Sequence, residues 1–299
     1  MLCAAGPYLS YTSREMNAVV PSIVLSHEPS AAALEKQRLL LEKLAAHDSL
    51  LVALSGGADS AYLAWAAHKS LGDRALAITA LSASFAAYDR EQVENFVRAT
   101  GVRHEFVETR ELEDPRYRAN NPDRCYYCKD ELFTVLDRMA LERSFVAVAY
   151  GINADDTHDF RPGHRAAQEH RTLAPLLDAA LHKPEIRALS RAAGLPTWDR
   201  PASACLASRI PYGVEVTPEE LRRVEDAEAV LRRLGFRQFR VRLHGELARI
   251  EIALEEMPRA LASDMAAAMA SGLKAAGFTY VTLDLEGYRQ GSLNETLRT

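Results

Sequence analysis

The most constraining feature of this chain is a short apolar run that leads at once into a Gly-rich turn and a helix-forming segment. Residues 50–54 (Leu-Leu-Val-Ala-Leu) show the unbroken apolar pattern of a strand buried on both faces. Residues 55–60 (Ser-Gly-Gly-Ala-Asp-Ser) form the turn, and residues 61–67 are rich in good helix formers. A buried strand followed directly by a helix indicates an α/β fold with a parallel sheet.

The composition of the turn suits a bound phosphate group. Gly56 and Gly57 allow the backbone to approach a ligand closely because they carry no Cβ. The helix that follows offers free N–H groups and the positive end of its dipole, and the hydroxyls of Ser55 and Ser60 add donors. Asp59 is unusual in an anion site, which indicates that it orients the loop or holds a Mg2+ ion shared with phosphates. The simpler alternative is a plain helix cap after a buried strand.

The turn does not contain the Gly-Lys-Ser/Thr of the Walker type. It resembles instead the SGGxDS loop of the PP-loop ATP pyrophosphatases, which cleave ATP to AMP and pyrophosphate and adenylate a substrate. The resemblance implies a PP-loop ATP pyrophosphatase domain over residues 31–213, after an N-terminal tail at residues 1–30 with mixed composition.

Two further apolar runs, at 75–81 and 145–151, and a short segment at 103–107 alternate with helical segments and predict three more parallel strands. Ligands of such sheets bind at the carboxyl ends of the strands. We therefore expect Ala80 to lie near the adenine edge and Gly151 and Asp155 to lie near the phosphates, where Asp155 suits Mg2+. A solvated turn is the alternative interpretation of each of these residues.

A change of composition after residue 213 predicts a smaller C-terminal α+β domain over residues 214–299. Its expected elements run helix, strand, strand, helix, strand, at 217–234, 239–243, 247–253, 257–276 and 280–285. Thr217 and Pro218 are typical of the cap and the first residue of a helix. Glu251, in the second of these strands, is a candidate metal ligand, although a carboxylate on an exposed strand is the simpler interpretation.

The composition argues against several classes of function. The formal net charge is −5, so nothing indicates a nucleic-acid duplex or an anionic membrane as a partner. No apolar run reaches the length of a membrane span, and the first residues lack the features of a signal peptide. We therefore expect a cytoplasmic protein whose four cysteines serve metal or redox chemistry before disulfides. The histidines are scattered without a paired spacing, so no histidine ligand is assigned.

Three of the cysteines lie in segments with chemical meaning. Cys125 and Cys128 form a CxxC at the start of a predicted helix that runs to about residue 143, where the helix dipole favours thiolates. Cys205 lies in residues 201–213, which read Pro-Ala-Ser-Ala-Cys-Leu-Ala-Ser-Arg-Ile-Pro-Tyr-Gly. We call this segment the cysteine loop. Loops of this irregular kind carry function more often than packing.

The cysteine loop resembles the hallmark loop of the LarE family, which are PP-loop sulfur transferases of nickel-pincer nucleotide biosynthesis. Supporting matches lie at 55–60, 151–156, 161–163 (Arg-Pro-Gly) and 287–292 (Gly-Tyr-Arg-Gln-Gly-Ser), and the resemblance covers about residues 35 to 294. The family adenylates a carboxylate of pyridinium-3,5-biscarboxylic acid mononucleotide, after which sulfur displaces AMP and a thiocarboxylate results. The resemblance therefore implies this small-molecule substrate, ATP, Mg2+ and a homo-oligomer such as a hexamer.

The resemblance also implies how sulfur is carried. Family members with a single cysteine, at the position of Cys205, give up that residue's own sulfur. Members with three cysteines are associated with a 4Fe–4S cluster that carries a replaceable sulfide, and Cys125, Cys128 and Cys205 match those three. Three thiolate ligands leave one iron of a cluster open. Two alternatives stay open, namely a Cys205 that is consumed without a cluster, and a zinc site. The sulfur supplier is not indicated by any residue.

Further roles follow from the same resemblance. Asp59, Ser208 and Arg209 join Cys205 as candidate catalytic residues, and the fixed fork of donors on Arg209 suits the phosphate of the substrate. Arg161 is expected to contact a carboxylate of the bound ligand. An arginine in a surface salt bridge is the simpler alternative for both arginines.

Three other functions fit parts of the pattern. An amide-forming synthetase related to the asparagine, GMP or NAD synthetases would use ammonia and would not need Cys205. A tRNA thiolase would use the same ATP loop and cysteines, but it would want a basic RNA-binding extension, which the net charge of −5 disfavours. A nucleotide-binding module without catalysis is the third alternative.

Overall fold

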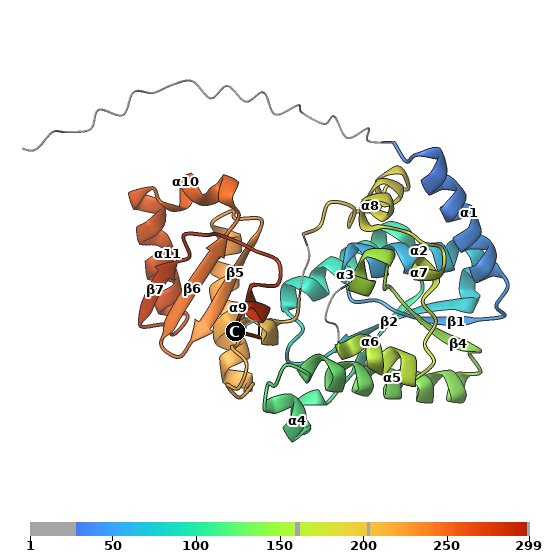
Figure 1. Ribbon diagram of the computed structural model, residues 1–299, viewed down its shortest axis with the longest axis horizontal. Helices are drawn as coiled ribbons and strands as arrows, with labels where there is room; N and C mark the ends of the chain where they lie inside the picture. Colours follow the sequence, from blue (N-terminus) through green and yellow to red (C-terminus); the bar gives the residue numbers. More distant parts are fainter. Residues whose placement is uncertain (1–27, 159–161, 202–203, 298–299) are drawn as a thin grey trace, which may run out of the picture.

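The computed structural model describes residues 28–158, 162–201 and 204–297, and Figure 1 shows two α/β units side by side, each built on its own sheet. The larger unit holds four strands and the smaller unit holds three. In the described ranges, no helix is long and apolar enough to cross a membrane.

The larger sheet is parallel throughout, as predicted. Its strands are β1 (Leu50–Ala53), β2 (Ala75–Leu81), β3 (His104–Glu108) and β4 (Ala147–Tyr150), in the order β3-β2-β1-β4. The fourth strand is shorter than predicted. The preceding helix is followed by a left-handed residue, Ser144, and the backbone N–H of Phe145 still donates to the carbonyl of Ala140 in that helix. The strand order reverses direction at β1, whose two neighbours are β2 and β4. In sheets of this kind a crevice opens beside such a reversal, at the carboxyl ends of the strands.

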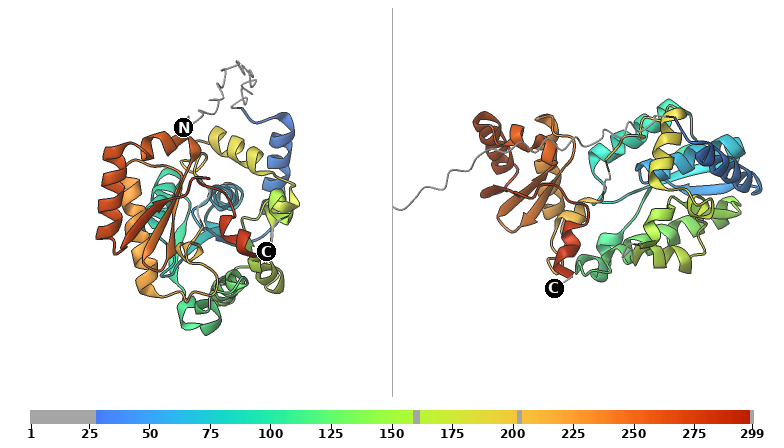
Figure 2. Two further views of the ribbon diagram at one scale, coloured as in Figure 1. Left: turned by 60° about the vertical axis from the view of Figure 1, so that its left-hand side comes forward. Right: turned by 45° about the horizontal axis from the view of Figure 1, so that its top comes forward.

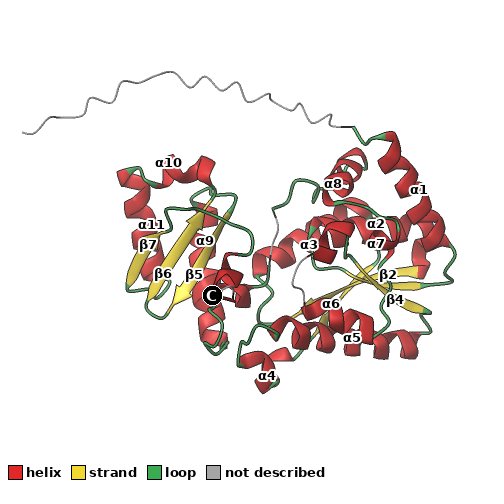
Figure 3. Ribbon diagram, in the orientation of Figure 1, coloured by secondary structure: helices red, strands yellow, loops and turns green. Residues whose placement is uncertain are grey.

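Helices cover both faces of this sheet (Figure 3). The helices of the larger unit are α1 (Ala31–Ala45), α2 (Ala58–Leu71), α3 (Ala87–Thr100), α4 (Pro115–Arg118), α5 (Arg124–Arg143), α6 (Pro162–Glu169), α7 (Pro175–Asp178) and α8 (Lys183–Ala192). Leu50 and Val52 pack with α1, α2, α3 and α8, whereas Leu51 and Ala53 pack with α5 and α6. All four residues of β1 are buried. The alternation of side chains along a strand therefore explains why this short run is apolar throughout.

The smaller unit has a mixed sheet in the order β5-β6-β7. Its elements are α9 (Pro218–Arg233), β5 (Phe239–His244), β6 (Leu247–Ile252), α10 (Met257–Ala260), α11 (Ser263–Ala275) and β7 (Tyr280–Leu283). Strand β6 is antiparallel to β5 and parallel to β7. The single helix predicted over 257–276 is two helices. The backbone is extended at Ala262, and a new helix begins at Ser263 with Asp264 in its first turn.

Short 3-10 helices connect these elements, at Gly72–Arg74, Glu111–Glu113, Ala154–His158, Leu206–Arg209, Leu254–Glu256 and Ser292–Leu297. The last of them lies at the junction between the two units, as the two views of Figure 2 show. The cysteine loop also belongs to this junction. Its residues Leu206, Ala207 and Ile210 pack into the hydrophobic core of the smaller unit, together with Ala86 and Tyr117 from the larger one. The domain boundary after residue 213 stays a prediction.

Candidate active site

A cleft of about 630 Å3 opens at the carboxyl ends of β1, β2 and β4, where the strand order reverses. The parts of the chain that line it include the Gly-rich turn, the start of α5, the cysteine loop and the C-terminal segment 288–294. Segments that lie more than 200 residues apart in sequence thus share one cavity. The predicted residues Ser55, Gly57, Asp59, Ser60 and Ala80 all line this cleft.

The Gly-rich turn is held in shape by its own serines and by a distant arginine. The hydroxyl of Ser60 accepts from the backbone N–H of Ser55 at 3.1 Å and donates to the carbonyl of Gly57 at 3.2 Å. Arg200, which is buried, donates to the carbonyl of Gly56. Gly56 has φ of +79°, and a Cβ there would lie 2.9 Å from a methyl of Val93. Only glycine therefore fits at this position without strain.

The start of α2 has the features of an anion site. Gly57 is the cap residue, and it offers no side-chain acceptor to the first N–H groups of this helix. Those donors, with the positive end of the dipole, point at the ligand position that the turn leaves open. Gly151, at the end of β4, has a second kind of role: a Cβ there would lie only 2.7 Å from Cα of Ser60. Gly151 therefore allows the end of β4 to pack directly against the turn.

Asp59 keeps one carboxylate oxygen for a ligand. Its Oδ2 accepts from Nδ2 of Asn153 at 3.2 Å and lies 3.5 Å from Nζ of Lys183. Its Oδ1 is buried and has no hydrogen-bond partner among the described residues. Burial raises the pKa of Asp59, and the charge of Lys183 acts against that rise. A buried oxygen without a partner, on the wall of the cleft, fits the Mg2+ ion that the sequence suggested.

Asp155 lies elsewhere than expected. Its carboxylate caps the start of α8, where it accepts from Nδ1 of His182 at 2.6 Å and from the backbone N–H of Lys183 at 2.7 Å. The hydrogen bond from His182 lowers the pKa of Asp155. The next residue, Asp156, lines the cleft, whereas Asp155 does not. Arg161 lies outside the described residues.

Cys125, Cys128 and Cys205 all line the cleft, although they come from two distant segments. Cys125 is exposed at the start of α5, and Cys128 and Cys205 are half-buried against the core of the smaller unit. Burial raises the pKa of the Cys128 thiol, so the lowering expected from the helix dipole does not prevail there. The described residues contain no group of three His, Cys, Asp or Glu side chains arranged around a single metal ion.

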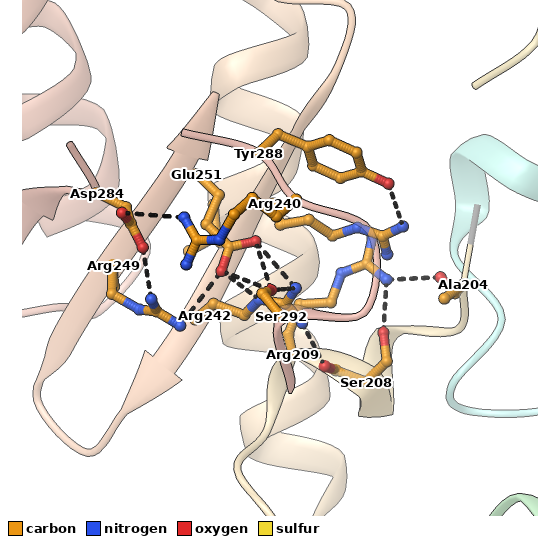
Figure 4. A network of polar contacts seen from close by, with 12 residues as sticks. Ala204, Ser208, Arg209, Arg240, Arg242, Arg249, Glu251, Asp284, Tyr288 and Ser292 are labelled. Atoms are coloured by element: carbon orange, nitrogen blue, oxygen red, sulfur yellow. Dashed lines mark hydrogen bonds and ion pairs between the residues drawn. The ribbon is translucent and has the colours of Figure 1, made fainter. Parts of the chain in front are cut away.

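Arg209 serves the cysteine loop itself. Its guanidinium forms a buried, two-pronged ion pair with Glu228 of α9, at 2.7 and 2.9 Å. The same side chain donates to the carbonyls of Ala204 and Cys205 at 2.6 and 3.0 Å, and to the hydroxyl of Ser208 at 2.9 Å (Figure 4). Arg209 thus holds the backbone around Cys205 and does not line the cleft. The expectation that it meets a phosphate is not supported by this placement.

A second buried arginine holds the same loop from the sheet of the smaller unit. Arg242 of β5 donates to the carbonyl of Ser208 at 2.7 Å and pairs with Glu251 of β6 at 2.9 Å (Figure 4). Glu251 is fully buried and also pairs with Arg249 at 3.2 Å and accepts from Ser292 at 3.0 Å. The carboxylate oxygens of Glu251 are therefore occupied by these donors, and the metal site considered for it is not formed.

A third arginine holds the loop from the larger unit. Arg124, which is 2% exposed, donates from Nη1 to the carbonyl of Ala207 at 2.8 Å and to Asn120. Its Nη2 lies 4.0 Å from the sulfur of Cys125. The side chain therefore links the start of α5, where the CxxC lies, to the backbone just beyond Cys205.

Tyr117 of α4 is buried on the same wall of the cleft, at 1% exposure. Its hydroxyl has no hydrogen-bond partner among the described residues. Burial raises the pKa of Tyr117, and the charges of Cys205 and Cys128 act in the same direction. The hydroxyl of Ser84 acts against this rise and also donates to Glu111 at 3.4 Å.

Positive charge gathers in the cleft although the whole chain is acidic. Among the described residues, the arginine and lysine side chains that line it besides Arg124 are Lys129, Lys183, Arg187, Arg200, Arg240, Arg242 and Arg289. Such a lining suits a ligand with several phosphate or carboxylate groups. Sequence reasoning missed these cations because their segments are far apart. One signal was available, since Arg240 and Arg242 lie two apart on a predicted strand and so share one face.

The fold and the site together define an α/β protein with a doubly covered parallel sheet, a Gly-rich turn at a helix start and three thiols in one cleft. No model of a known protein family matches the chain. The chain is 34% identical over 266 residues to the pyridinium-3,5-bisthiocarboxylic acid mononucleotide synthase of Lactiplantibacillus plantarum, which covers 88% of this chain and 95% of that protein. It therefore belongs to the family of that synthase, the LarE family.

Two further relatives carry no functional name. An uncharacterized protein of Synechocystis is 44% identical over 250 residues, which are 84% of this chain and 93% of the relative. An uncharacterized protein of Methanocaldococcus jannaschii is 30% identical over 170 residues, which are 57% of this chain and 66% of that protein.

Proposed function

We propose that this protein is an ATP-dependent sulfur transferase that adenylates a carboxylate of pyridinium-3,5-biscarboxylic acid mononucleotide and converts it into a thiocarboxylate. The observation that carries the proposal is the meeting of the Gly-rich turn with Cys125, Cys128 and Cys205 in one cleft of a protein from this family. The name of the relative from Lactiplantibacillus plantarum, a pyridinium-3,5-bisthiocarboxylic acid mononucleotide synthase, supports the identity of the product.

We assign ATP binding to the Gly-rich turn, on a fold of the PP-loop ATP pyrophosphatase type. The N–H groups at Gly57 and the start of α2 receive the phosphates, and the hydroxyl of Ser55 lies beside them. The unpartnered oxygen of Asp59 binds the Mg2+ ion that accompanies the nucleotide. Adenylation then needs no protein nucleophile, because the donors of the turn stabilise the charge of the departing pyrophosphate.

The second substrate enters from the side of the smaller unit. Arg240 of β5 lines the cleft there and provides positive charge for the phosphate of the mononucleotide. Arg242 also lines the cleft, but its donors are used by Glu251, Ser292 and the carbonyl of Ser208. Arg240 is buried, donates to the hydroxyl of Tyr288 at 3.3 Å and lies over its ring. Arg240 replaces Arg209 in the role that the sequence suggested for it, since the donors of Arg209 are used by Glu228 and the loop backbone.

The cysteines deliver sulfur to the activated carboxylate. In the transfer step a sulfur nucleophile forms a bond to the carbonyl carbon, the bond from that carbon to the AMP oxygen breaks, and AMP leaves with the electron pair. The three thiols fit a cluster better than a single zinc ion, because each thiolate of a cluster binds a different iron and the thiols are not arranged around one point. When bound by Cys125, Cys128 and Cys205, a 4Fe–4S cluster would supply an open iron and a replaceable sulfide.

One experiment separates this proposal from its rivals. Pyrophosphate release from ATP is measured without oxygen, with the mononucleotide, ammonia or tRNA offered in turn, and the product is identified by mass spectrometry. Release with the mononucleotide, accompanied by thiocarboxylate, is expected. The Cys205→Ala variant should release pyrophosphate and form no thiocarboxylate, while the control Cys3→Ala should match the wild type in both. Thiocarboxylate from C205A, or release only with ammonia or tRNA, would contradict the proposal.

Two further measurements decide how the sulfur is held. Iron and acid-labile sulfide are counted in protein purified without oxygen, and a colourless protein that carries zinc would contradict the cluster. The intact mass is compared before and after one turnover. A loss of one sulfur and two hydrogens would show that Cys205 gives up its own sulfur, whereas an unchanged mass is expected if sulfur comes from outside.

A further inference from the structure

A buried carboxylate that the proposed reaction has not yet used lies on the wall of the cleft. Glu111 belongs to the short 3-10 helix Glu111–Glu113, which follows β3, and it is 3% exposed. Its side chain lines the cleft together with Thr109 and Ser84. Glutamate is almost never buried to this extent unless it is paired. The partner of this carboxylate therefore needs an explanation.

The protein itself gives Glu111 little of that pairing. Among the described residues, its carboxylate accepts one side-chain hydrogen bond, from Ser84 at 3.4 Å, and it forms no ion pair. That distance exceeds the usual range for a hydroxyl donor, and the hydroxyl of Ser84 also lies 3.0 Å from that of Ser82. The buried Glu251 shows the usual arrangement, because two arginines and a serine surround it. Glu111 therefore keeps acceptor capacity for a ligand in the cleft.

The place of Glu111 at the sheet edge indicates which part of a nucleotide it faces. The Gly-rich turn follows β1, Ala80 lies in β2 and Glu111 follows β3, and these strands are neighbours in that order. The backbone N–H of Thr109 donates to the carbonyl of Leu81 at 3.1 Å, which keeps the ends of β2 and β3 together. A nucleotide with its phosphates at the turn thus extends across β2 toward Glu111 with its sugar and base.

The charge of Glu111 selects the group that can bind there. A carboxylate repels phosphates and other carboxylates, which the arginine and lysine side chains of the cleft attract. Two neighbouring hydroxyl donors suit it instead, because each of its oxygens can accept a hydrogen bond. Acidic side chains bind ribose hydroxyls in this way in other nucleotide-binding α/β folds. Both nucleotides of the proposed reaction carry a ribose.

We propose that Glu111 binds the ribose hydroxyls of a nucleotide in the cleft, supplied by ATP or by the mononucleotide. This inference rests on the proposed function, because it assigns a contact to the substrates of that reaction. Glu111 then selects ribonucleotides over 2′-deoxynucleotides and takes no part in the transfer of sulfur.

The test compares Glu111→Gln with the control Glu113→Gln, at an exposed position of the same 3-10 helix. Calorimetry measures the dissociation constants of ATP, 2′-deoxy-ATP, inosine triphosphate and the mononucleotide, each added alone in the presence of Mg2+. The melting temperature of each variant is measured without ligand. These readouts do not require sulfur transfer, and thiocarboxylate formation is measured separately by mass spectrometry.

We expect E111Q to melt at the same temperature as the wild type or higher, because a weakly paired buried charge is removed. If ATP supplies the ribose, the wild type should bind ATP about tenfold more tightly than 2′-deoxy-ATP, the effect of one lost hydrogen bond to a charged group. E111Q should then bind these two ligands within about twofold of each other. If the mononucleotide supplies the ribose, E111Q should bind the mononucleotide about tenfold more weakly and ATP as before. E113Q should match the wild type throughout.

Three results would overturn the inference. The first is unchanged binding of every ligand by E111Q, and the second is a melting temperature of E111Q well below that of E113Q. The third is a loss of discrimination against inosine triphosphate instead of 2′-deoxy-ATP, which would place Glu111 at the amino group of adenine. Binding as expected without thiocarboxylate would contradict the proposed function alone, whereas thiocarboxylate from a wild type that E111Q matches in all binding would contradict this inference alone.

Discussion

At the scale of single residues, the cysteine loop is held by buried charges that its own sequence does not announce. Arg209 and Glu228 are 5% and 3% exposed, and their ion pair supports the carbonyls of Ala204 and Cys205. Burial opposes the ionisation of Glu228, but the guanidinium of Arg209 outweighs it, and the pKa of Glu228 is lowered. Both groups are therefore charged in the folded protein.

Glu228→Gln should destabilise the protein by about 3 to 5 kcal/mol at neutral pH, because it leaves the charge of Arg209 buried without a partner. The free energy of unfolding is measured with urea, and Asp226→Asn, at an exposed position of the same helix, should stay within about 0.5 kcal/mol of the wild type. A carboxyl with a lowered folded pKa stabilises above its unfolded pKa and loses that effect as the pH falls. The difference between E228Q and the wild type should therefore shrink below about pH 4.5, and a constant difference would contradict the assignment.

Local sequence patterns predict some residues of the site and miss those whose partners lie far away in the sequence. Ser55, Gly56 and Gly57 follow a buried strand directly, so local sequence places them at the sheet edge. Arg209 was expected at a phosphate because its partner Glu228 lies 19 positions away on another element, which no local pattern reveals. Asp155 was expected at Mg2+ because the sequence does not show that the start of α8 comes back to it.

At the scale of elements, a half-buried histidine ties β3 to β2 and β1. The hydroxyl of Thr79 donates its only proton to the carbonyl of Leu54 at 2.6 Å. His104 Nε2 lies 2.9 Å from the same hydroxyl and must therefore be the donor of that hydrogen bond, in a neutral ring. Burial lowers the pKa of His104 to about 4, although the carboxylates of Glu105 and Glu94 act in the opposite direction.

This histidine should make stability depend on pH. Between about pH 4 and the usual histidine value near 6.5, the unfolded chain binds a proton that the folded protein does not. The stabilising effect of a neutral His104 is therefore complete above pH 6.5 and is lost as the pH falls toward 4. Urea unfolding at a series of pH values should show a smaller fall for His104→Gln than for the wild type. Parallel curves for the two proteins would refute this role.

Glu251 joins three elements of the smaller unit. It pairs with Arg242 and Arg249 and accepts from Ser292 of the C-terminal 3-10 helix. Glu251→Gln should lower the free energy of unfolding by about 3 to 5 kcal/mol and should speed tryptic cleavage after Arg289, because Ser292 loses its charged acceptor. Glu255→Gln, at an exposed position nearby, is the control and should change neither readout. Unchanged cleavage of E251Q would show that other contacts hold the C-terminal segment.

At the scale of the whole molecule, the cysteine loop connects two hydrophobic cores, and Asn120 fastens it. Asn120 is fully buried with φ of +53°, and its amide donates to the carbonyls of Pro211 and Val214 at 2.8 and 3.0 Å. Asparagine tolerates this left-handed conformation better than alanine does. One side chain of the larger unit thus fixes the path of the chain into the smaller one.

Asn120→Ala should reduce stability by about 2 kcal/mol or more, because buried carbonyls lose their donor and the backbone is strained. It should also loosen the link between the units. Calorimetry should show one transition for the wild type and for the exposed control Asn121→Ala, and two separated transitions for N120A. A single, merely shifted transition of N120A would contradict the assignment of Asn120 as the link.

The architecture was predictable where local pattern decides it. The apolar run of β1 and the Thr217–Pro218 start of α9 both show in the sequence, and the parallel sheet follows from the alternation of elements. The cationic lining of the cleft was not predictable, because Lys183, Arg200 and Arg242 meet only through the packing of distant segments. The neighbourhood of Tyr117 depends on the same long-range packing.

The central claim is that thiols from two distant segments meet beside the Gly-rich turn, and a bifunctional thiol reagent tests it most directly. Reduced protein is treated without oxygen with a short bis-alkylating bimane, and the bridged peptides are identified by mass spectrometry, with and without ATP and Mg2+. The account predicts a bridge from Cys205 to Cys125 or Cys128, and slower bridging when ATP fills the cleft. Bridges confined to Cys125 and Cys128, with Cys205 alkylated singly whether or not ATP is present, would contradict it.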